Sequence, residues 1–153
     1  MTISVEAFQA FLYAEIPMVE YMQLKLCEIN THSIQALAPI GPNINDKQTV
    51  FGGSSSALMT ICGWSLIKSQ LEHHGLHNDV VIHQAKTRWH KAQTDDLNIT
   101  AALSDEHDWD KLIAQLKTSR RPVKISVDCV VHNQHNEKCS SMQGGFVVLG
   151  QNT

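Results

Sequence analysis

One helical segment constrains the fold of this chain more than any other feature. From Ser54 to about Glu72 the apolar residues lie on every face of the expected helix instead of forming one stripe: Ala57, Leu58, Met59, Ile61, Cys62, Trp64, Leu66, Ile67 and Leu71. A helix that is apolar all round is a buried helix. The rest of the chain must therefore supply a surface that wraps around it.

Strand patterns supply that surface. Two strand-like stretches precede the helix, at about 21–29 and 33–40, and Asn30, Thr31 and His32 form the expected hairpin turn between them. After the helix the period changes to two, which predicts four more strands at 79–94, 97–103, 122–133 and 139–149.

Two shorter helices complete the expected elements. Ser4 is placed to cap a helix that carries Phe8, Phe11 and Leu12, and Pro17 is expected to end it. Between the fourth and fifth strands, Trp109, Leu112, Ile113 and Leu116 follow the i, i+3, i+4, i+7 spacing of a surface helix with one apolar stripe.

These elements predict an α+β fold in which a six-stranded antiparallel sheet wraps around the central helix. The length suits one domain that covers residues 1–153. A single chain leaves the edges of such a sheet open, so the expected assembly is a homodimer formed by side-by-side pairing, or a dimer of such dimers.

Composition narrows the classes of function. The chain is 42% apolar and 18% charged with a net charge of −3, which gives no basic surface for nucleic acid or membrane. Its first residues lack the basic and apolar regions of a signal peptide. The four cysteines are scattered without a C-x-x-C pair, so free thiols and a cytoplasmic location are expected.

The loop before the central helix carries the most specific motif. The run from Asn43 to Ser54, which ends in Phe51-Gly52-Gly53-Ser54, resembles the signature of the thioesterase family known from the C-terminal half of YiiD-type proteins. Gly63-Trp64 further along the helix is also similar to that family. The resemblance covers essentially the whole chain. It implies a hot-dog fold, an acyl-CoA or acyl-carrier-protein substrate, and no metal or organic cofactor beyond the carrier itself.

The chemistry of this junction supports the resemblance independently. The start of a helix leaves backbone N–H groups without partners, and the helix dipole adds partial positive charge there. A thioester carbonyl on the N–H of Gly53 or Ser54 would be polarised as in an oxyanion hole, and Gly52 would let the substrate approach the backbone. The alternative is that the glycines only let the helix enter beneath tightly packed strands.

The same junction is similar to that of phenylacetyl-CoA-type thioesterases, which read N-G-x-x-x-x-H-G-G. In that family the Asn orients substrate or water, and a helix Asp seven residues past the second Gly is the base or nucleophile. The Asn falls on Asn45, which matches, whereas the His falls on Phe51 and the Asp on Thr60, which do not. Phe51 is therefore expected to contact substrate, and Thr60 cannot act as a general base.

Three replacements for the missing carboxylate follow. Asp46, beside Asn45, could supply it from the loop, or it could be an ordinary turn residue. Thr60 or Ser56 could hold the water by hydrogen bonds while Gly53 polarises the carbonyl. A side chain of a partner subunit could complete the site.

Other clusters have weaker claims. Arg88, Arg120, Arg121 and Lys124 could hold the phosphates of coenzyme A, or could be solvated charges at a strand entry. Cys129, His132, His135 and Cys139 have tolerable zinc spacing, but Cys129 and His132 point to opposite faces of one strand, so no metal site is expected. Cys62 is read as a core residue.

The predicted function is hydrolysis of an acyl thioester. A non-hydrolytic module that binds acyl thioesters is the first alternative, because the helix lacks a carboxylate before Glu72. A hydroxyacyl dehydratase is the second alternative, and Phe51 and Thr60 stand where its catalytic His and acid would be needed.

Overall fold

One antiparallel sheet and one long helix organise the molecule, in a computed structural model that describes residues 4–150. The elements are, in chain order, α1 (Val5–Glu15), α2 (Pro17–Tyr21), β1 (Lys25–Ile29), β2 (Ser33–Ala38), the 3-10 turn η1 (Gly41–Asn43), α3 (Gly52–His73), β3 (Val80–Trp89), β4 (Leu97–Leu103), α4 (Trp109–Thr118), β5 (Val123–His132) and β6 (Lys138–Val148). This confirms the predicted six strands, the central helix and the extra helix between β4 and β5.

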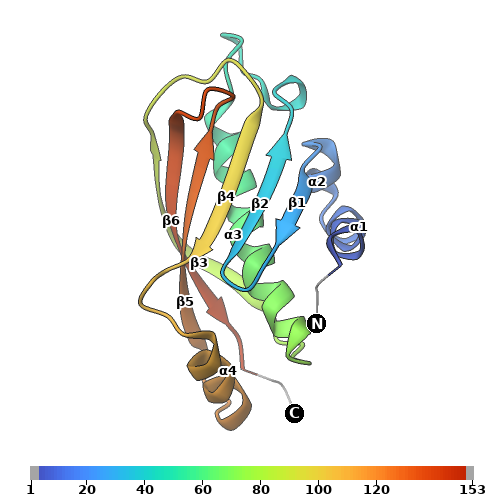
Figure 1. The fold of residues 1–153 in the computed structure, drawn as a ribbon, viewed down its shortest axis with the longest axis vertical. Coiled ribbons are helices and arrows are strands. Elements are labelled where there is room, and N and C mark those ends of the chain that lie inside the picture. The colour runs from blue at the N-terminus through green and yellow to red at the C-terminus, as the bar shows by residue number, and fades with distance from the viewer. Residues whose placement is uncertain (1–3, 151–153) are drawn as a thin grey trace.

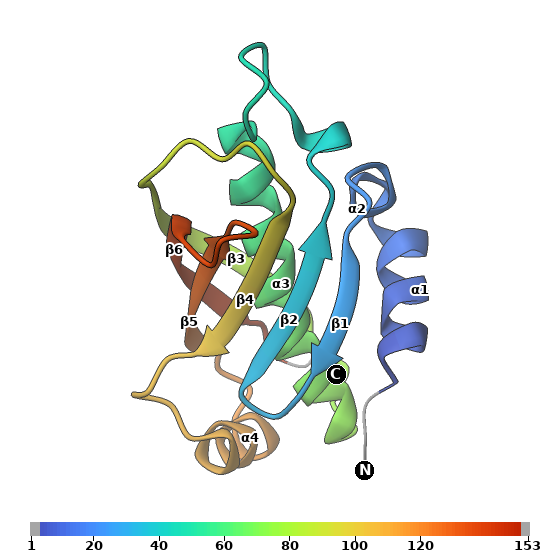
Figure 2. The ribbon, with the colours of Figure 1, turned by 45° about the horizontal axis from the view of Figure 1, so that its top comes forward.

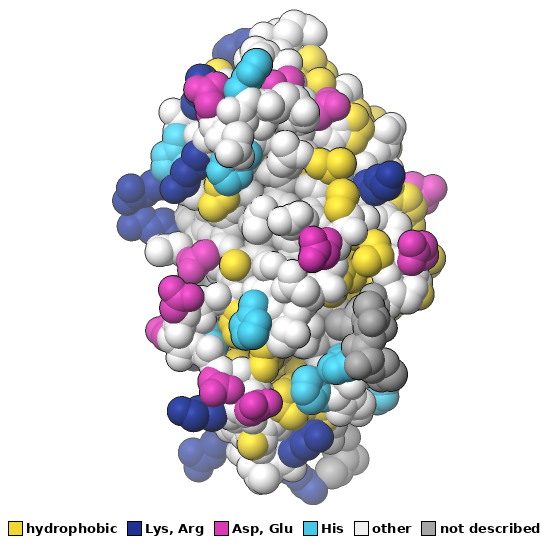
Figure 3. All heavy atoms as spheres, viewed as in Figure 1, with side chains coloured by type: hydrophobic (Ala, Val, Ile, Leu, Met, Phe, Trp, Pro, Cys, Tyr) yellow, Lys and Arg dark blue, Asp and Glu magenta, His cyan; other side chains and the backbone are white. Residues whose placement is uncertain are grey.

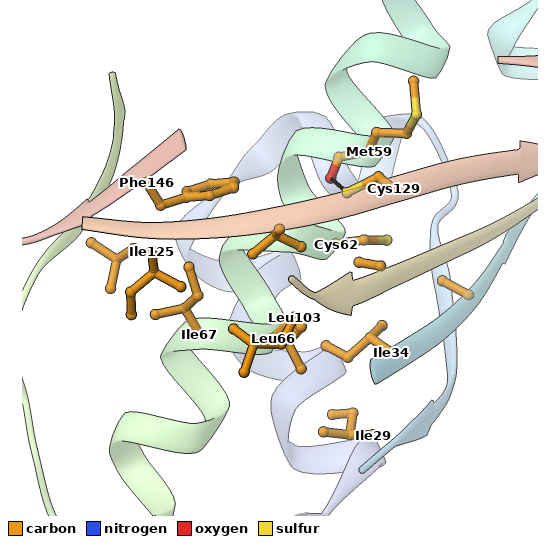
Figure 4. Close-up of a cluster of buried hydrophobic side chains, with 14 of the residues drawn as sticks. Ile29, Ile34, Met59, Cys62, Leu66, Ile67, Leu103, Ile125, Cys129 and Phe146 are labelled. Atoms are coloured by element: carbon orange, nitrogen blue, oxygen red, sulfur yellow. Dashed lines mark hydrogen bonds between the residues drawn. The ribbon is translucent and has the colours of Figure 1, made fainter. Parts of the chain in front are cut away.

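The sheet curves around α3 in the order β1-β2-β4-β5-β6-β3, with every neighbouring pair antiparallel (Figures 1 and 2). Inward side chains of the strands, among them Ile34, Ile125 and Phe146, pack around Leu66 and Ile67 of the helix (Figure 4). This is the hot-dog arrangement that the family resemblance implies.

Burial of α3 follows the prediction on the side that faces the sheet. Eleven of its 22 residues are buried, a larger share than in any other helix of the described chain, and only Gly53 and Glu72 are exposed. A stripe formed by Ser56, Thr60, Ile61, Trp64 and Lys68 is half-buried, so the expectation of full burial on every side is too strong. The sheet wraps most of the helix and leaves this stripe partly open.

The C-terminal end of α3 is fixed by a backbone motif that the sequence predicts. Gly75 has a φ of +72°, the left-handed conformation that favours glycine after a helix. The Leu76 N–H donates to the carbonyl of Leu71 at 2.8 Å, and the Gly75 N–H donates to that of Glu72 at 3.0 Å. This pair of bonds satisfies two of the last helical carbonyls.

Two predicted boundaries are wrong. Tyr21, the expected start of the first strand, instead ends α2, and that strand begins at Lys25. Proline is well suited to the first turn of a helix, so Pro17 begins a new helix as well as ending α1. The strand expected over 79–94 ends at Trp89, because the segment after it turns away and the Gln93 carbonyl accepts the Val50 N–H at 2.8 Å.

The two edges of the sheet differ. Along β1, the edge is covered by α1: the Gln9 side chain donates to the Leu24 carbonyl and accepts from the Leu26 N–H, and the Tyr13 hydroxyl donates to the Leu24 carbonyl. β3 forms the opposite edge with no strand beyond it in the described chain, and its Val81 and Ile82 are exposed. Within residues 4–150, no helix is both long and apolar enough to span a membrane.

Candidate functional site

The N-terminus of α3 presents two backbone amides without protein partners. Phe51 is the N-cap, and its carbonyl accepts the N–H of Ser54 at 3.0 Å and that of Ser55 at 3.2 Å. Among the described residues, no acceptor bonds the N–H of Gly52 or Gly53. The available pair is therefore Gly52 and Gly53, one residue earlier than the predicted pair of Gly53 and Ser54.

A cavity of about 300 Å³ lies beside this helix end. Its wall includes Val50, Gly52, Ser55, Trp89 and Ser140. The Trp89 indole N–H faces the Gly52 carbonyl at 3.2 Å and Ser55 Oγ at 3.3 Å, which fixes the indole against the first turn of the helix. The cavity thus lies between the helix start and the adjoining ends of β3 and β6.

Ser140 gives this cavity an unused hydroxyl. The residue is 3% exposed, and its Oγ has no hydrogen-bond partner among the described residues. Buried polar groups are nearly always paired with protein, water or ligand. The Ser140 hydroxyl is therefore a second polar group, besides the free amides, with which a bound molecule can form a hydrogen bond.

Both glycines are also required by packing. A Cβ on Gly52 would lie 3.1 Å from Trp89 Nε1, and a Cβ on Gly53 would lie 2.5 Å from Phe51 Cε2. The Phe51 and Trp89 side chains are 55% and 58% exposed despite their size. The helix start is thus flanked by two aromatic side chains that remain open to a ligand or another subunit.

The loop before the helix engages Asn45 in its own turn. The Asn45 side-chain oxygen accepts the N–H of Lys47 at 2.9 Å and of Thr49 at 3.0 Å, and its amide donates to Thr49 Oγ1 at 2.8 Å. Both acceptor positions of the side-chain oxygen are used, and one amide N–H remains. Asn45 can therefore donate to a ligand but not accept from one.

Asp46 points away from the cavity of its own subunit. Its side chain is 82% exposed and forms an ion pair with the equally exposed Lys47 at 2.9 Å. Figure 2 shows the segment between η1 and α3 projecting beyond the N-terminal end of the helix. A carboxylate carried at the tip of this loop is placed to meet another molecule.

Thr60 and Ser56 are connected to each other by the helix backbone. The Thr60 hydroxyl donates to the Ser56 carbonyl at 2.9 Å and also lies 3.7 Å from Met142 Sδ. Neither residue lines the cavity at the helix start. The Thr60 oxygen retains acceptor capacity, but its proton is engaged.

The predicted phosphate ligands are far apart: Arg88 lies at one end of the sheet, and Arg120, Arg121 and Lys124 lie at the start of β5. Arg88 on β3 is opposite Ser141 on β6, which is opposite Val130 on β5. Arg120 and Arg121 precede Val123, at the other end of β5, and Val123 is already roughly 23 Å along the strand from Val130 at about 3.3 Å per residue. These arginines do not form one cluster.

Burial suppresses thiolate chemistry at the site. It raises the pKa of Cys62, on the buried face of α3, to about 12. It also raises the pKa of Cys139, which lines the cavity, and the negative charge of Asp95 adds to that effect. Both cysteines are therefore neutral thiols near pH 7. Within residues 4–150, no three His, Cys, Asp or Glu side chains are grouped as metal ligands.

The sequence-based prediction missed Trp89, His90 and Ser140. Trp89 and Ser140 are paired across β3 and β6 and face α3, while His90 lines the cavity and has its Nε2 2.8 Å from Ser141 Oγ. The period-two pattern of β6 identifies which of its residues face inward. It does not reveal which inward position lies over the helix start, because that depends on strand register.

Comparisons with known proteins agree with this geometry. The model of a family described as "Putative thioesterase (yiiD_Cterm)" matches residues 5–150. A structure of a "putative thioesterase" from Shewanella oneidensis superposes with a TM-score of 0.82 at 22% identity, covering 95% of this chain and 96% of that one. No curated protein matches the sequence.

Two further solved structures have the same fold. A Pseudomonas aeruginosa protein described as "Probable Thioesterase" has a TM-score of 0.83 at 14% identity, covering 99% of both chains. A thioesterase from Haemophilus influenzae has a TM-score of 0.77 at 14% identity, covering 98% of this chain and 93% of that one. At these identities the likeness establishes the hot-dog fold.

Proposed function

The chain belongs to the family described as "Putative thioesterase (yiiD_Cterm)", and on that premise we propose that it hydrolyses an acyl thioester at the N-terminus of α3. The observation that carries the proposal is the pair of unpartnered amides at Gly52 and Gly53, beside a cavity whose Ser140 hydroxyl is also unpartnered. Donors that are fixed before the substrate arrives stabilise the charge that develops on a carbonyl oxygen.

The reaction uses these groups in order. A base takes a proton from water as the water oxygen attacks the carbonyl carbon, and the two amides hold the resulting oxyanion. The tetrahedral intermediate then collapses, the carbon–sulfur bond breaks, and the protonated base returns its proton to the thiolate. The products are a carboxylic acid and a thiol, and no metal or organic cofactor takes part.

Two side chains are candidates for the base. His90 lines the cavity, and an imidazole nitrogen can accept a proton from water. Asp46 projects on its loop, where its carboxylate can reach the corresponding cavity of a partner subunit. If His90 is the base, His90→Gln lowers kcat by about 100-fold or more and Asp46→Asn has little effect. If Asp46 is the base, Asp46→Asn causes the large loss and His90→Gln has little effect.

We propose that the partner is a second copy of this chain, paired through β3. This strand is the uncovered edge of the sheet, and its exposed Val81 and Ile82 would be buried in such a pair. In such a pair we expect the loop that carries Asn45 and the helix start at Gly53 to face the second subunit. The free thiols of the described cysteines suit the cytoplasm, which we propose as the location.

The experiment is a hydrolysis screen over acyl thioesters of increasing chain length, carried by coenzyme A, by carrier protein and by N-acetylcysteamine. Turnover of any of them supports hydrolysis. One observation favours the alternative of a non-hydrolytic binding module: no carboxylate lines the cavity of the described subunit. Saturable acyl-thioester binding without any turnover would establish that alternative.

A further inference from the structure

A second, larger cavity lies on the outer face of the sheet. It has a volume of about 570 Å³, within the usual size range of small-molecule sites, and it is lined by Lys86 and Arg88 of β3, Asp128 of β5, and Lys138, Ser141 and Gln143 of β6. Strand pairing explains the grouping, because Arg88 lies opposite Ser141 and Lys86 opposite Gln143. We call this cavity the outer groove.

The cations of the outer groove are not neutralised by the protein. In the described chain none of Lys86, Arg88 and Lys138 forms an ion pair, although Asp128 is in the same wall. Nearby Lys91, by contrast, is paired with Glu137. The groove therefore carries three positive charges against one negative charge, although the net charge of the chain is −3. Concave surfaces lined by one sign of charge concentrate ligands of the opposite sign.

Figure 3 shows Lys and Arg side chains gathered at the left of the molecule, on the side where Figure 1 places β3 and β6. The outer groove and the cavity at the helix start lie on opposite faces of the same end of β3. Arg88 belongs to the outer face, the next residue Trp89 belongs to the inner face, and His90 lines both cavities. Since β3 ends at Trp89 and the next residue, His90, lines both cavities, a flexible ligand can pass around the end of the strand without crossing its paired edge.

From this arrangement we infer that the outer groove binds the phosphorylated adenosine of coenzyme A while the acyl thioester lies at the start of α3. The inference rests on the proposed function and names its substrate class. Arginine and lysine provide the charge-assisted hydrogen bonds that phosphate oxygens accept. The concave shape suits a nucleotide better than a carrier protein, because a stable protein interface buries roughly 800 Å² on each partner.

The binding test uses calorimetric titration with adenosine 3′,5′-bisphosphate, and with adenosine as the uncharged probe. The expected result is saturable binding of the bisphosphate that weakens as salt is added, and no binding of adenosine. The double variant Lys86→Ala/Arg88→Ala should raise the Kd at least about tenfold. Lys124→Ala is the matched control, because it removes an equally exposed lysine from the same sheet at the far end of β5. No saturable binding, or the same Kd in the double variant, would overturn the inference.

The kinetic test separates this inference from the proposed function. The double variant should lower kcat/KM for acyl-CoA at least about tenfold relative to kcat/KM for the same acyl group on N-acetylcysteamine, which lacks the nucleotide. If both thioesters are hydrolysed and the double variant leaves the ratio of their kcat/KM values unchanged, the nucleotide site is refuted and the proposed hydrolase activity stands. Bisphosphate binding that depends on Lys86 and Arg88, with no turnover of either thioester, overturns the hydrolase and supports the groove. Loss of acyl-carrier-protein turnover alone would assign the groove to that protein and refute a nucleotide site.

Discussion

The free amide of Gly52 can be removed without removing any hydrogen bond of the folded protein. Gly52 is the first helical residue, where proline is favoured, and its N–H has no acceptor among the described residues. Phe51 before it has φ −64° and ψ 128°, the extended conformation that a residue preceding proline requires. Gly52→Pro therefore suits the backbone and deletes one of the two proposed oxyanion donors.

The matched control is Gly52→Ala. Both variants introduce a Cβ, which would lie 3.1 Å from Trp89 Nε1, so this contact is common to the two, and proline adds only the Cγ and Cδ of its ring. Only the alanine variant keeps the N–H. Loss of one oxyanion donor costs about 100-fold to 1,000-fold in kcat, or roughly 3–4 kcal/mol. We expect Gly52→Pro to be slower than Gly52→Ala by that factor.

The assay is steady-state hydrolysis of the best acyl thioester, with the thiol product detected by a colorimetric reagent. Thermal unfolding of both variants checks that they are folded, and their Tm values should agree within a few degrees because neither loses a hydrogen bond. Equal kcat values for two folded variants would refute the role of the Gly52 amide. A deficit that appears only in KM would show that the amide binds the ground state and transition state equally.

Three other outcomes follow from the structure. Gly63→Ala would place a Cβ 2.9 Å from Phe146 Cζ, so it should lower the free energy of unfolding by about 1–3 kcal/mol, and denaturant titration should show that combining it with Phe146→Leu costs less than the two single changes added together. Ile82→Glu should give a monomer in sedimentation velocity, and a wild-type protein that is monomeric at micromolar concentration would contradict pairing through β3. Burial raises the pKa of Cys62 from 9.0 to about 12, so between these pH values the thiol ionises in the unfolded chain but stays neutral in the folded one. The free energy of unfolding should therefore fall from pH 9 towards pH 12, and Cys62→Ala should reduce that slope.

Much of the fold could be predicted from the periodicity of apolar residues in the sequence. The apolar residues of α3 and the alternation in β5 identified a sheet around a helix, and the spacing from Trp109 to Leu116 located α4, whose four predicted stripe residues are buried. These patterns are local consequences of helix and strand geometry. Boundaries at Pro17 and Trp89 were mispredicted, because tertiary hydrogen bonds and the permissive first turn of a helix decide them.

The candidate site could be predicted only in part from the sequence. The motif around Gly52 and Gly53 located the helix start, since a glycine pair before a buried helix is a local signal. Ser140 is distant in sequence and reaches the cavity only through the register of β3, β5 and β6. The outer groove likewise depends on Lys86, Arg88 and Lys138 coming from two paired strands, which no sequence spacing reveals.

The asymmetry of the sheet edges limits how far this protein can polymerise. Gln9 and Tyr13 occupy the backbone groups at Leu24 and Leu26 beside β1, so a further strand cannot add there, whereas β3 remains available. In the proposed pair through β3, both outer ends of the combined sheet are β1 edges, so no further copy is expected to add by strand pairing. A variant that loses the Gln9 contacts would leave the β1 edge at each end of the proposed dimer free to pair with another copy, and open-ended filaments would form.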